Sequence, residues 1–161
     1  MTESHHLPHS IPPAPPAAER FQMLINGKPF VANSITGRSC WRAELASTPS
    51  RRIWKILASG RVARQGTSVG FYIDQSLTPG IYDLVDNTLI SVVYHLTPRN
   101  VARVLHSRAF QRGRLALLEC DPSTQRLRGT FDFSLPSSDF HVTAGEFDLQ
   151  WTHDPAITSA Q

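Results

Sequence analysis

Residues 111–151 have the pattern of three β-strands separated by two turns. The middle strand alternates strictly, with Leu127, Gly129, Phe131, Phe133 and Leu135 in one phase and Arg126, Arg128, Thr130, Asp132 and Ser134 in the other. Because successive strand residues point to opposite faces of a sheet, this alternation predicts a half-buried antiparallel strand. The two turns are predicted at residues 121–124 and 136–139, where Pro, Ser and Asp cluster. The apolar phase of the last strand reverses at Gly145, after Val142 and Ala144, which predicts a β-bulge there.

The same kind of pattern upstream predicts an all-β protein. Asn26-Gly27 is a strong hairpin signal and joins predicted strands at residues 21–25 and 28–32. Further strands are predicted at residues 40–46, 52–59, 69–73, 81–84, 89–95 and 113–120. Residues 97–110 fit a helix that starts at Thr97, but residues 101–107 fit one more strand equally well. We favour a strand or a single helical turn, because the neighbouring segments are β. The fold expected is an antiparallel β-sandwich or flattened β-barrel of about nine or ten short strands, with at most one short helix.

One domain, at residues 20–152, accounts for most of the 161-residue chain. Residues 1–19 carry five of the twelve prolines and no apolar periodicity, so we expect a disordered tail there. Residues 153–161 are expected to form a frayed C-terminal tail. No run approaches the ~18 apolar residues of a membrane-spanning helix.

Arginine dominates the basic residues, because only Lys28 and Lys55 are lysines among 16. This bias fits either a surface for anionic partners or a genome rich in arginine codons. Two stretches, residues 50–65 and 95–118, contain basic residues but no acidic ones. If both lie on one face, the protein has a positive surface that could steer an anionic partner. The residues predicted for such a surface are Arg99, Arg103, Arg108, Arg112 and Arg114. We do not expect nucleic acid as the partner, because only Phe110 and Trp54 are placed to interleave aromatic rings with these arginines.

Motifs for catalysis and cofactor binding are missing from the sequence. It has no G-x-S-x-G, no phosphate-binding glycine loop and no H-E-x-x-H, so no catalytic residue and no cofactor is predicted. The tail histidines His5, His6 and His9 could bind a transition metal, but a flexible tail offers no preformed geometry. The domain histidines His95, His106, His141 and His153 form no i, i+2 or i, i+4 pair, so no metal site is predicted.

Two further groups of residues leave alternatives open. Asp132, Glu146 and Asp148 could form an acid/base couple, but their phase favours an outward position in ion pairs with Arg126 and Arg128. Cys40 and Cys120 fit small core residues, or a disulfide if the compartment is oxidising.

The last third of the domain resembles a family of small bacterial proteins of unknown function, many of them lipoproteins. The resemblance rests on a Gly-led strand at residues 113–118, Asp121, the Arg-Gly-Thr-Phe-x-Phe run at 128–133 and the Val-Thr-x-Gly-x-Phe-Asp run at 142–148. Residues 25–30 and 79–82 match more loosely. The resemblance implies an all-β body and no catalytic residues. No signal peptide or lipid-attachment cysteine is visible near the start, so we expect a cytoplasmic protein.

Three functional hypotheses follow. The first is a non-enzymatic binding or interaction module that meets an unknown protein or anionic partner through the arginine-rich surface. The second is a lipocalin-like carrier of a small ligand, with an internal apolar pocket lined by Trp41, Trp54, Phe71 and Phe131. The third, which we favour least, is a hydrolytic or metal-dependent enzyme. Exposed edge strands would also permit homo-oligomers.

Overall fold

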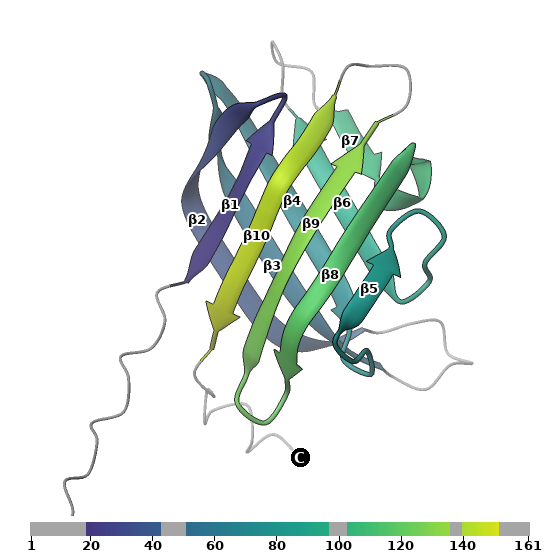
Figure 1. Ribbon diagram of the computed structural model, residues 1–161. Coiled ribbons are helices and arrows are strands. Elements are labelled where there is room, and N and C mark those ends of the chain that lie inside the picture. Colours follow the sequence, from purple (N-terminus) through teal and green to yellow (C-terminus); the bar gives the residue numbers. More distant parts are fainter. Residues whose placement is uncertain (1–18, 43–50, 97–102, 136–139, 152–161) are drawn as a thin grey trace, which may run out of the picture.

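The computed structural model describes residues 19–42, 51–96, 103–135 and 140–151, in which ten strands and one short 3-10 helix are found (Figure 1). For four strand residues only the backbone is described: Trp41, Arg42, Arg51 and Arg103. The elements in chain order are β1 (Arg20–Ile25), β2 (Lys28–Arg42), β3 (Arg51–Val62), β4 (Gln65–Asp74), β5 (Gly80–Asp83), β6 (Ile90–Leu96), β7 (Arg103–His106), η2 (Ser107–Ala109), β8 (Arg112–Asp121), β9 (Arg126–Ser134) and β10 (His141–Gln150). The predicted all-β class is confirmed.

The ten strands form one antiparallel sheet that curls into a half-barrel. Its strand order is β5-β8-β9-β10-β1-β2-β3-β4-β6-β7, so β5 and β7 are the two edges. Figure 1 shows β5, β8, β9, β10 and β1 as a front wall and β2, β3, β4, β6 and β7 as a back wall. The core lies between these walls, because the inward residues of both belong to one apolar cluster.

The β1–β2 hairpin is built as its sequence predicts. Asn26 and Gly27 have φ angles of 49° and 76°, the left-handed conformation that a type I′ turn requires at both central positions. The turn is also fixed to β10, because the Asn26 amide donates to the carbonyl of His141 and the Asn26 side chain accepts from the His141 amide, each at 2.8 Å. These bonds place the hairpin turn beside the start of β10.

Strand β2 corrects one prediction. Separate strands were expected at residues 28–32 and 40–46, but the described chain forms a single 15-residue strand to Arg42, and residues 43–46 lie outside the described residues. The pairing of β2 with β3 shifts between Ala32 and Ser34, which marks a bulge that lets the strand bend from the front wall to the back wall. Gly60 faces this bend, where an added Cβ would lie 2.1 Å from the carbonyl oxygen of Val31.

The predicted bulge in the last strand is confirmed. The pairing of β10 with β9 shifts between Val142 and Gly145, and Ala144 has a φ of 49°. We expected Ala144 to share the inward phase of Val142, but Ala144 is exposed because the extra residue precedes Gly145. Gly145 itself is buried under the Phe131 ring, which an added Cβ would approach to 2.4 Å.

Residues 103–110 combine the two structures weighed for that stretch. Arg103–His106 pairs with β6 as β7, and Ser107–Ala109 forms the single 3-10 turn. The helix start at Thr97 and the turn at residues 136–139 lie outside the described residues.

A closely packed aromatic cluster fills the space between the walls. The rings of Phe71 and Phe131 lie 4.7 Å apart between centroids, and Phe21 and Phe147 pack against them. Trp54 is also buried and stacks on Trp151 at 5.2 Å. Each such ring stabilises the fold by about 1.5–3 kcal/mol through removal from water. Trp54, Phe71 and Phe131, which were predicted to line a pocket, belong to this core.

Candidate functional site: a pocket at the turn end of the half-barrel

A hollow of about 590 Å³ lies at the end of the half-barrel that carries the β1–β2 and β3–β4 turns. This end is uppermost in Figure 1. We call the hollow the end pocket. Its lining residues come from both turns, from β4 and β6, and from the residue before β10: Ile25, Asn26, Lys28, Val62, Ala63, Arg64, Gln65, Thr67, Tyr94, Leu96 and Phe140.

The deeper part of the end pocket is apolar, with two buried hydroxyl side chains. Ile25 and Tyr94 are buried, and Phe140 packs on the Tyr94 ring at 5.0 Å between centroids. The neighbouring Thr67 hydroxyl is used, because it donates to the carbonyl of His95 at 2.8 Å. The Tyr94 hydroxyl is buried without a hydrogen-bond partner in the described chain, and it does not meet Thr67 in hydrogen-bond geometry. A buried polar group without a partner is rare in folded proteins.

Burial raises the pKa of Tyr94 above its ordinary value. The phenol therefore stays protonated at neutral pH. It is available as a hydrogen-bond donor and acceptor.

The rim of the end pocket is cationic. Lys28 follows the β1–β2 turn, and Arg64 lies in the β3–β4 turn, where Ala63 has a φ of 56°. The pairing of β2 with β3 ends at Phe30 and Val62, so Lys28, two residues before Phe30, and Arg64, two residues after Val62, lie at the same end of this strand pair. Both side chains are exposed and form no ion pair with the described residues, and no acidic side chain belongs to the described lining.

The arginines predicted as a partner surface are spread over different elements. Arg112 and Arg114 point outward from β8, and Arg114 pairs with Asp132 at 3.6 Å. Arg108 is exposed on η2, Arg103 starts β7, and Arg99 lies outside the described residues. The earlier basic stretch lies mostly on β3 in the back wall, which also contains β7, whereas β8 belongs to the front wall. The arginines of the later stretch are therefore divided between the two walls.

The outer face of the back wall carries basic residues of its own. Arg38 on β2 lies directly opposite Lys55 on β3, and neither forms an ion pair in the described part of the chain. The ammonium group of Lys55 lies 5.9 Å from the centroid of the Tyr72 ring. Like charges directly opposite each other destabilise a sheet, so this pair has a structural cost.

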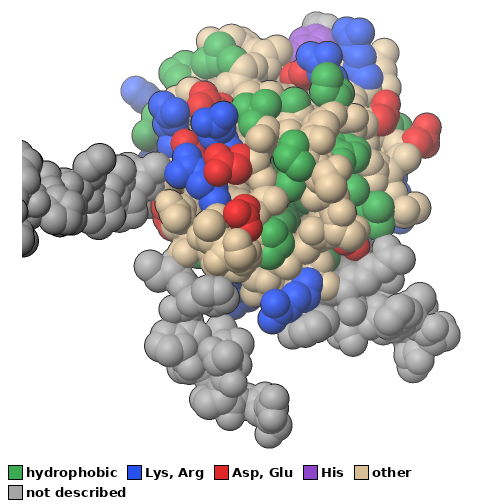
Figure 2. All heavy atoms as spheres, turned by 60° about the horizontal axis from the view of Figure 1, so that its bottom comes forward, with side chains coloured by type: hydrophobic (Ala, Val, Ile, Leu, Met, Phe, Trp, Pro, Cys, Tyr) green, Lys and Arg blue, Asp and Glu red, His purple; other side chains and the backbone are tan. Residues whose placement is uncertain are grey.

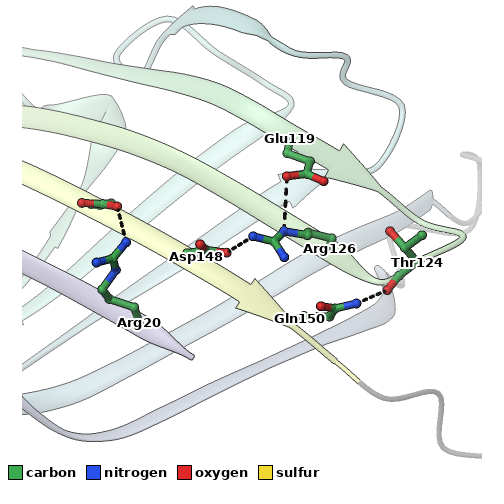
Figure 3. A network of polar contacts seen from close by, with 7 residues as sticks. Arg20, Glu119, Thr124, Arg126, Asp148 and Gln150 are labelled. Atoms are coloured by element: carbon green, nitrogen blue, oxygen red, sulfur yellow. Dashed lines mark hydrogen bonds and ion pairs between the residues drawn. The ribbon is translucent and has the colours of Figure 1, made fainter. Parts of the chain in front are cut away.

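The carboxylates of the front wall meet arginines, as their outward phase predicts. Arg126 lies 3.2 Å from Glu119 and 2.9 Å from Asp148, and Arg20 lies 3.1 Å from Glu146 (Figure 3). Figure 2 shows basic and acidic side chains intermixed on one part of the molecular surface. Arg126 is confirmed as a partner, whereas Arg128 forms no ion pair within the described residues. Within the described residues, Asp132, Glu146 and Asp148 each lie beside an arginine.

The described chain contains no group of three or more His, Cys, Asp or Glu side chains placed to hold a metal ion. Cys40 and Cys120 are free thiols, so the disulfide alternative is not formed in this structure. The Cys120 thiol donates to the Leu77 carbonyl at 3.2 Å.

No helix within the described ranges has the length and hydrophobicity needed to cross a membrane.

Comparison of the chain with protein-family models, with curated proteins and with solved structures found no match. The resemblance of the last third to a bacterial family therefore stays a prediction.

Sequence patterns missed the end pocket because its residues are distant in the chain and meet only through strand register. A partial signal was present: Lys28 follows the Asn-Gly turn and Arg64 sits between two predicted strands, so both are turn-end cations. Nothing in the alternation distinguishes Tyr94 from the inward aromatic residues of a packed core.

Proposed function

We propose that this protein is a non-enzymatic binding protein that holds a small, largely apolar molecule in the end pocket. The observation that carries the proposal is the combination of a hollow of about 590 Å³ with the unpartnered Tyr94 hydroxyl in its lining. Small-molecule sites commonly have volumes of about 300–1,000 Å³ and combine apolar walls with a few polar groups.

The packing of the rest of the molecule supports this location. Trp54, Phe71 and Phe131 fill the middle of the half-barrel, whereas the end pocket opens at the turn end beside Val62 and Leu96. Leaving a hydroxyl buried without a partner costs about 1–3 kcal/mol, and a ligand atom that bonds to it removes this cost. A binding site explains why the chain places a tyrosine there.

A neutral apolar dye, N-phenylnaphthylamine, tests the proposal by fluorescence titration. A ligand of this size at about −0.3 kcal/mol per heavy atom gives a Kd of roughly 0.2 mM or tighter. Leu96→Trp and Val62→Phe fill the end pocket and should each weaken binding at least tenfold. Leu57→Trp is the matched control, because Leu57 is exposed on the outer face of the back wall. Equal binding by wild type and both filling variants would contradict the proposal.

A second proposed function, contact with an anionic partner, is favoured by the Arg38–Lys55 pair. A partner bearing negative charge would turn the repulsion between these two cations into attraction at the outer face of the back wall. The salt concentration that elutes the protein from heparin tests this. Arg38→Glu with Lys55→Glu should elute clearly earlier than Arg112→Glu with Arg114→Glu, which makes the same charge change on the front wall. The reverse order would favour the arginine surface predicted from the sequence.

A further inference from the structure

We infer that the ligand of the end pocket is an organic monoanion, with its acidic group at the mouth and its apolar body inside. The inference rests on the proposed function and specifies its ligand class. Lys28 and Arg64 are the charged groups of the described lining, and both are positive. A cleft with low-dielectric walls and charges of one sign concentrates ions of the opposite sign.

The position of these cations relative to the walls fixes where the acidic group lies. Lys28 and Arg64 are exposed, whereas Tyr94 and Thr67 are buried. Long basic side chains keep their charged heads in water while their methylene stems cover apolar surface. An acidic group between the two heads is therefore paired and remains partly hydrated, while the apolar body contacts Ile25, Leu96 and Phe140.

The opposite orientation is disfavoured by desolvation. At the buried end, the Thr67 hydroxyl already donates to the His95 carbonyl, so the Tyr94 hydroxyl is the free one of the two. The two cations of the described lining are exposed and do not lie at this end. A carboxylate held there would lose its hydration with too few donors in exchange, which costs several kcal/mol. The buried end instead fits an uncharged oxygen or nitrogen of the ligand, which the neutral Tyr94 phenol can bond.

Both cations line the one end pocket, and neither has an acidic partner in the described structure. An acidic group bound at the mouth of this pocket is therefore attracted by two positive charges. Exposed ion pairs stabilise by about 0.2–1 kcal/mol each, so the two together correspond to at most about a 25-fold gain in affinity.

A matched pair of dyes tests the inference. N-phenylnaphthylamine is neutral, and anilinonaphthalene sulfonate adds one negative charge to the same ring system. We expect Lys28→Met with Arg64→Met to weaken binding of the sulfonate by about two- to 25-fold while leaving binding of the neutral dye unchanged. The matched control is Arg38→Met with Arg61→Met, which removes two cations outside the pocket lining and should leave both affinities unchanged.

The outcomes separate the two proposals. If both dyes bind and are blocked by Leu96→Trp, but the sulfonate is insensitive to Lys28→Met with Arg64→Met, the anionic ligand class is refuted while the pocket function stands. If neither dye binds, or Leu96→Trp changes nothing, the proposed function fails and the inference fails with it. Loss of sulfonate binding at high salt, with neutral-dye binding retained, supports the inference independently.

Discussion

Replacing Tyr94 by phenylalanine should stabilise the protein in the absence of ligand. The Tyr94 side chain is fully buried, and its hydroxyl has no partner in the described chain. A buried unpartnered hydroxyl costs about 1–3 kcal/mol, and phenylalanine keeps the ring contacts with Phe133 and Phe140. The oxygen leaves only a small space, which costs a few tenths of a kcal/mol at about 24 cal/mol per Å³.

The net change expected is a gain of about 1 kcal/mol in the free energy of unfolding. This corresponds to a rise of about 4 °C in Tm for a domain of this size. Urea denaturation followed by tryptophan fluorescence measures the free energy, and calorimetry measures Tm. Tyr82→Phe is the matched control, and it should change the free energy of unfolding in the opposite direction, because the Tyr82 hydroxyl donates to the Thr78 carbonyl. Its loss should destabilise the protein by about 0.5–1 kcal/mol.

The pH dependence provides an independent check. Burial raises the pKa of Tyr94, so the folded state keeps this proton to higher pH than the unfolded chain, whose tyrosine titrates near 10. The unfolded state therefore binds fewer protons above about pH 10, and wild-type stability falls as pH rises through this range. The Tyr94→Phe variant should lack the part of this fall in stability that comes from Tyr94. A variant that is less stable than wild type by 1 kcal/mol or more would refute the reasoning, because the hydroxyl would then have a partner in solution.

Three further predictions test the packing, the ion pairs and the thiol. Gly145→Ala should lower the free energy of unfolding by more than about 2 kcal/mol, because the added Cβ would lie 2.6 Å from the Phe131 carbonyl oxygen. Gly66→Ala is the control in the same denaturation assay and should be nearly neutral, because no atom lies within 4 Å of the added Cβ. Arg126→Met should lower the free energy of unfolding by about 2–3 kcal/mol, because it leaves Asp148, whose side chain is 13% exposed, without its ion-pair partner. Arg114→Met should lower it by less than about 0.5 kcal/mol, because the side chains of Arg114 and Asp132 are 63% and 51% exposed. Burial and the Asp121 charge raise the pKa of Cys120, so mass spectrometry should find slower iodoacetamide labelling there at pH 8 than in the urea-unfolded chain. Equal rates would contradict this.

Much of the fold could be predicted because alternation and turn chemistry are local. The inward phase of Leu127, Phe131 and Phe133, and the Asn26-Gly27 turn, follow from neighbouring residues alone. The continuity of β2 could not be predicted, because its bulge between Ala32 and Ser34 is defined by the partner strand β3. Neither residue interrupts the sequence pattern in a way that identifies a bend.

The candidate site was beyond prediction for a related reason. Trp54, Phe71 and Phe131 are large inward aromatic residues, and whether they line a void or fill it depends on how the two walls approach each other. The end pocket depends instead on which turns share one end of the half-barrel. That grouping brings Lys28 and Arg64 to the same pocket, although 35 residues lie between them in the chain.

The position of β1 between β10 and β2 has a consequence for how this protein is made. Strands at the two ends of the described chain pair at the centre of the sheet, where Arg20 bonds to Glu146, 126 positions away. During synthesis β1 can pair only with β2 until β10 has left the ribosome, so the front wall is completed by a late, long-range step that slows folding. Loss of β10 would remove a central strand and separate β5, β8 and β9 from the other six strands. A chain truncated before β10 would therefore present two new unpaired strand edges, whereas loss of an edge strand would create one. Aggregation is the expected fate of such a product.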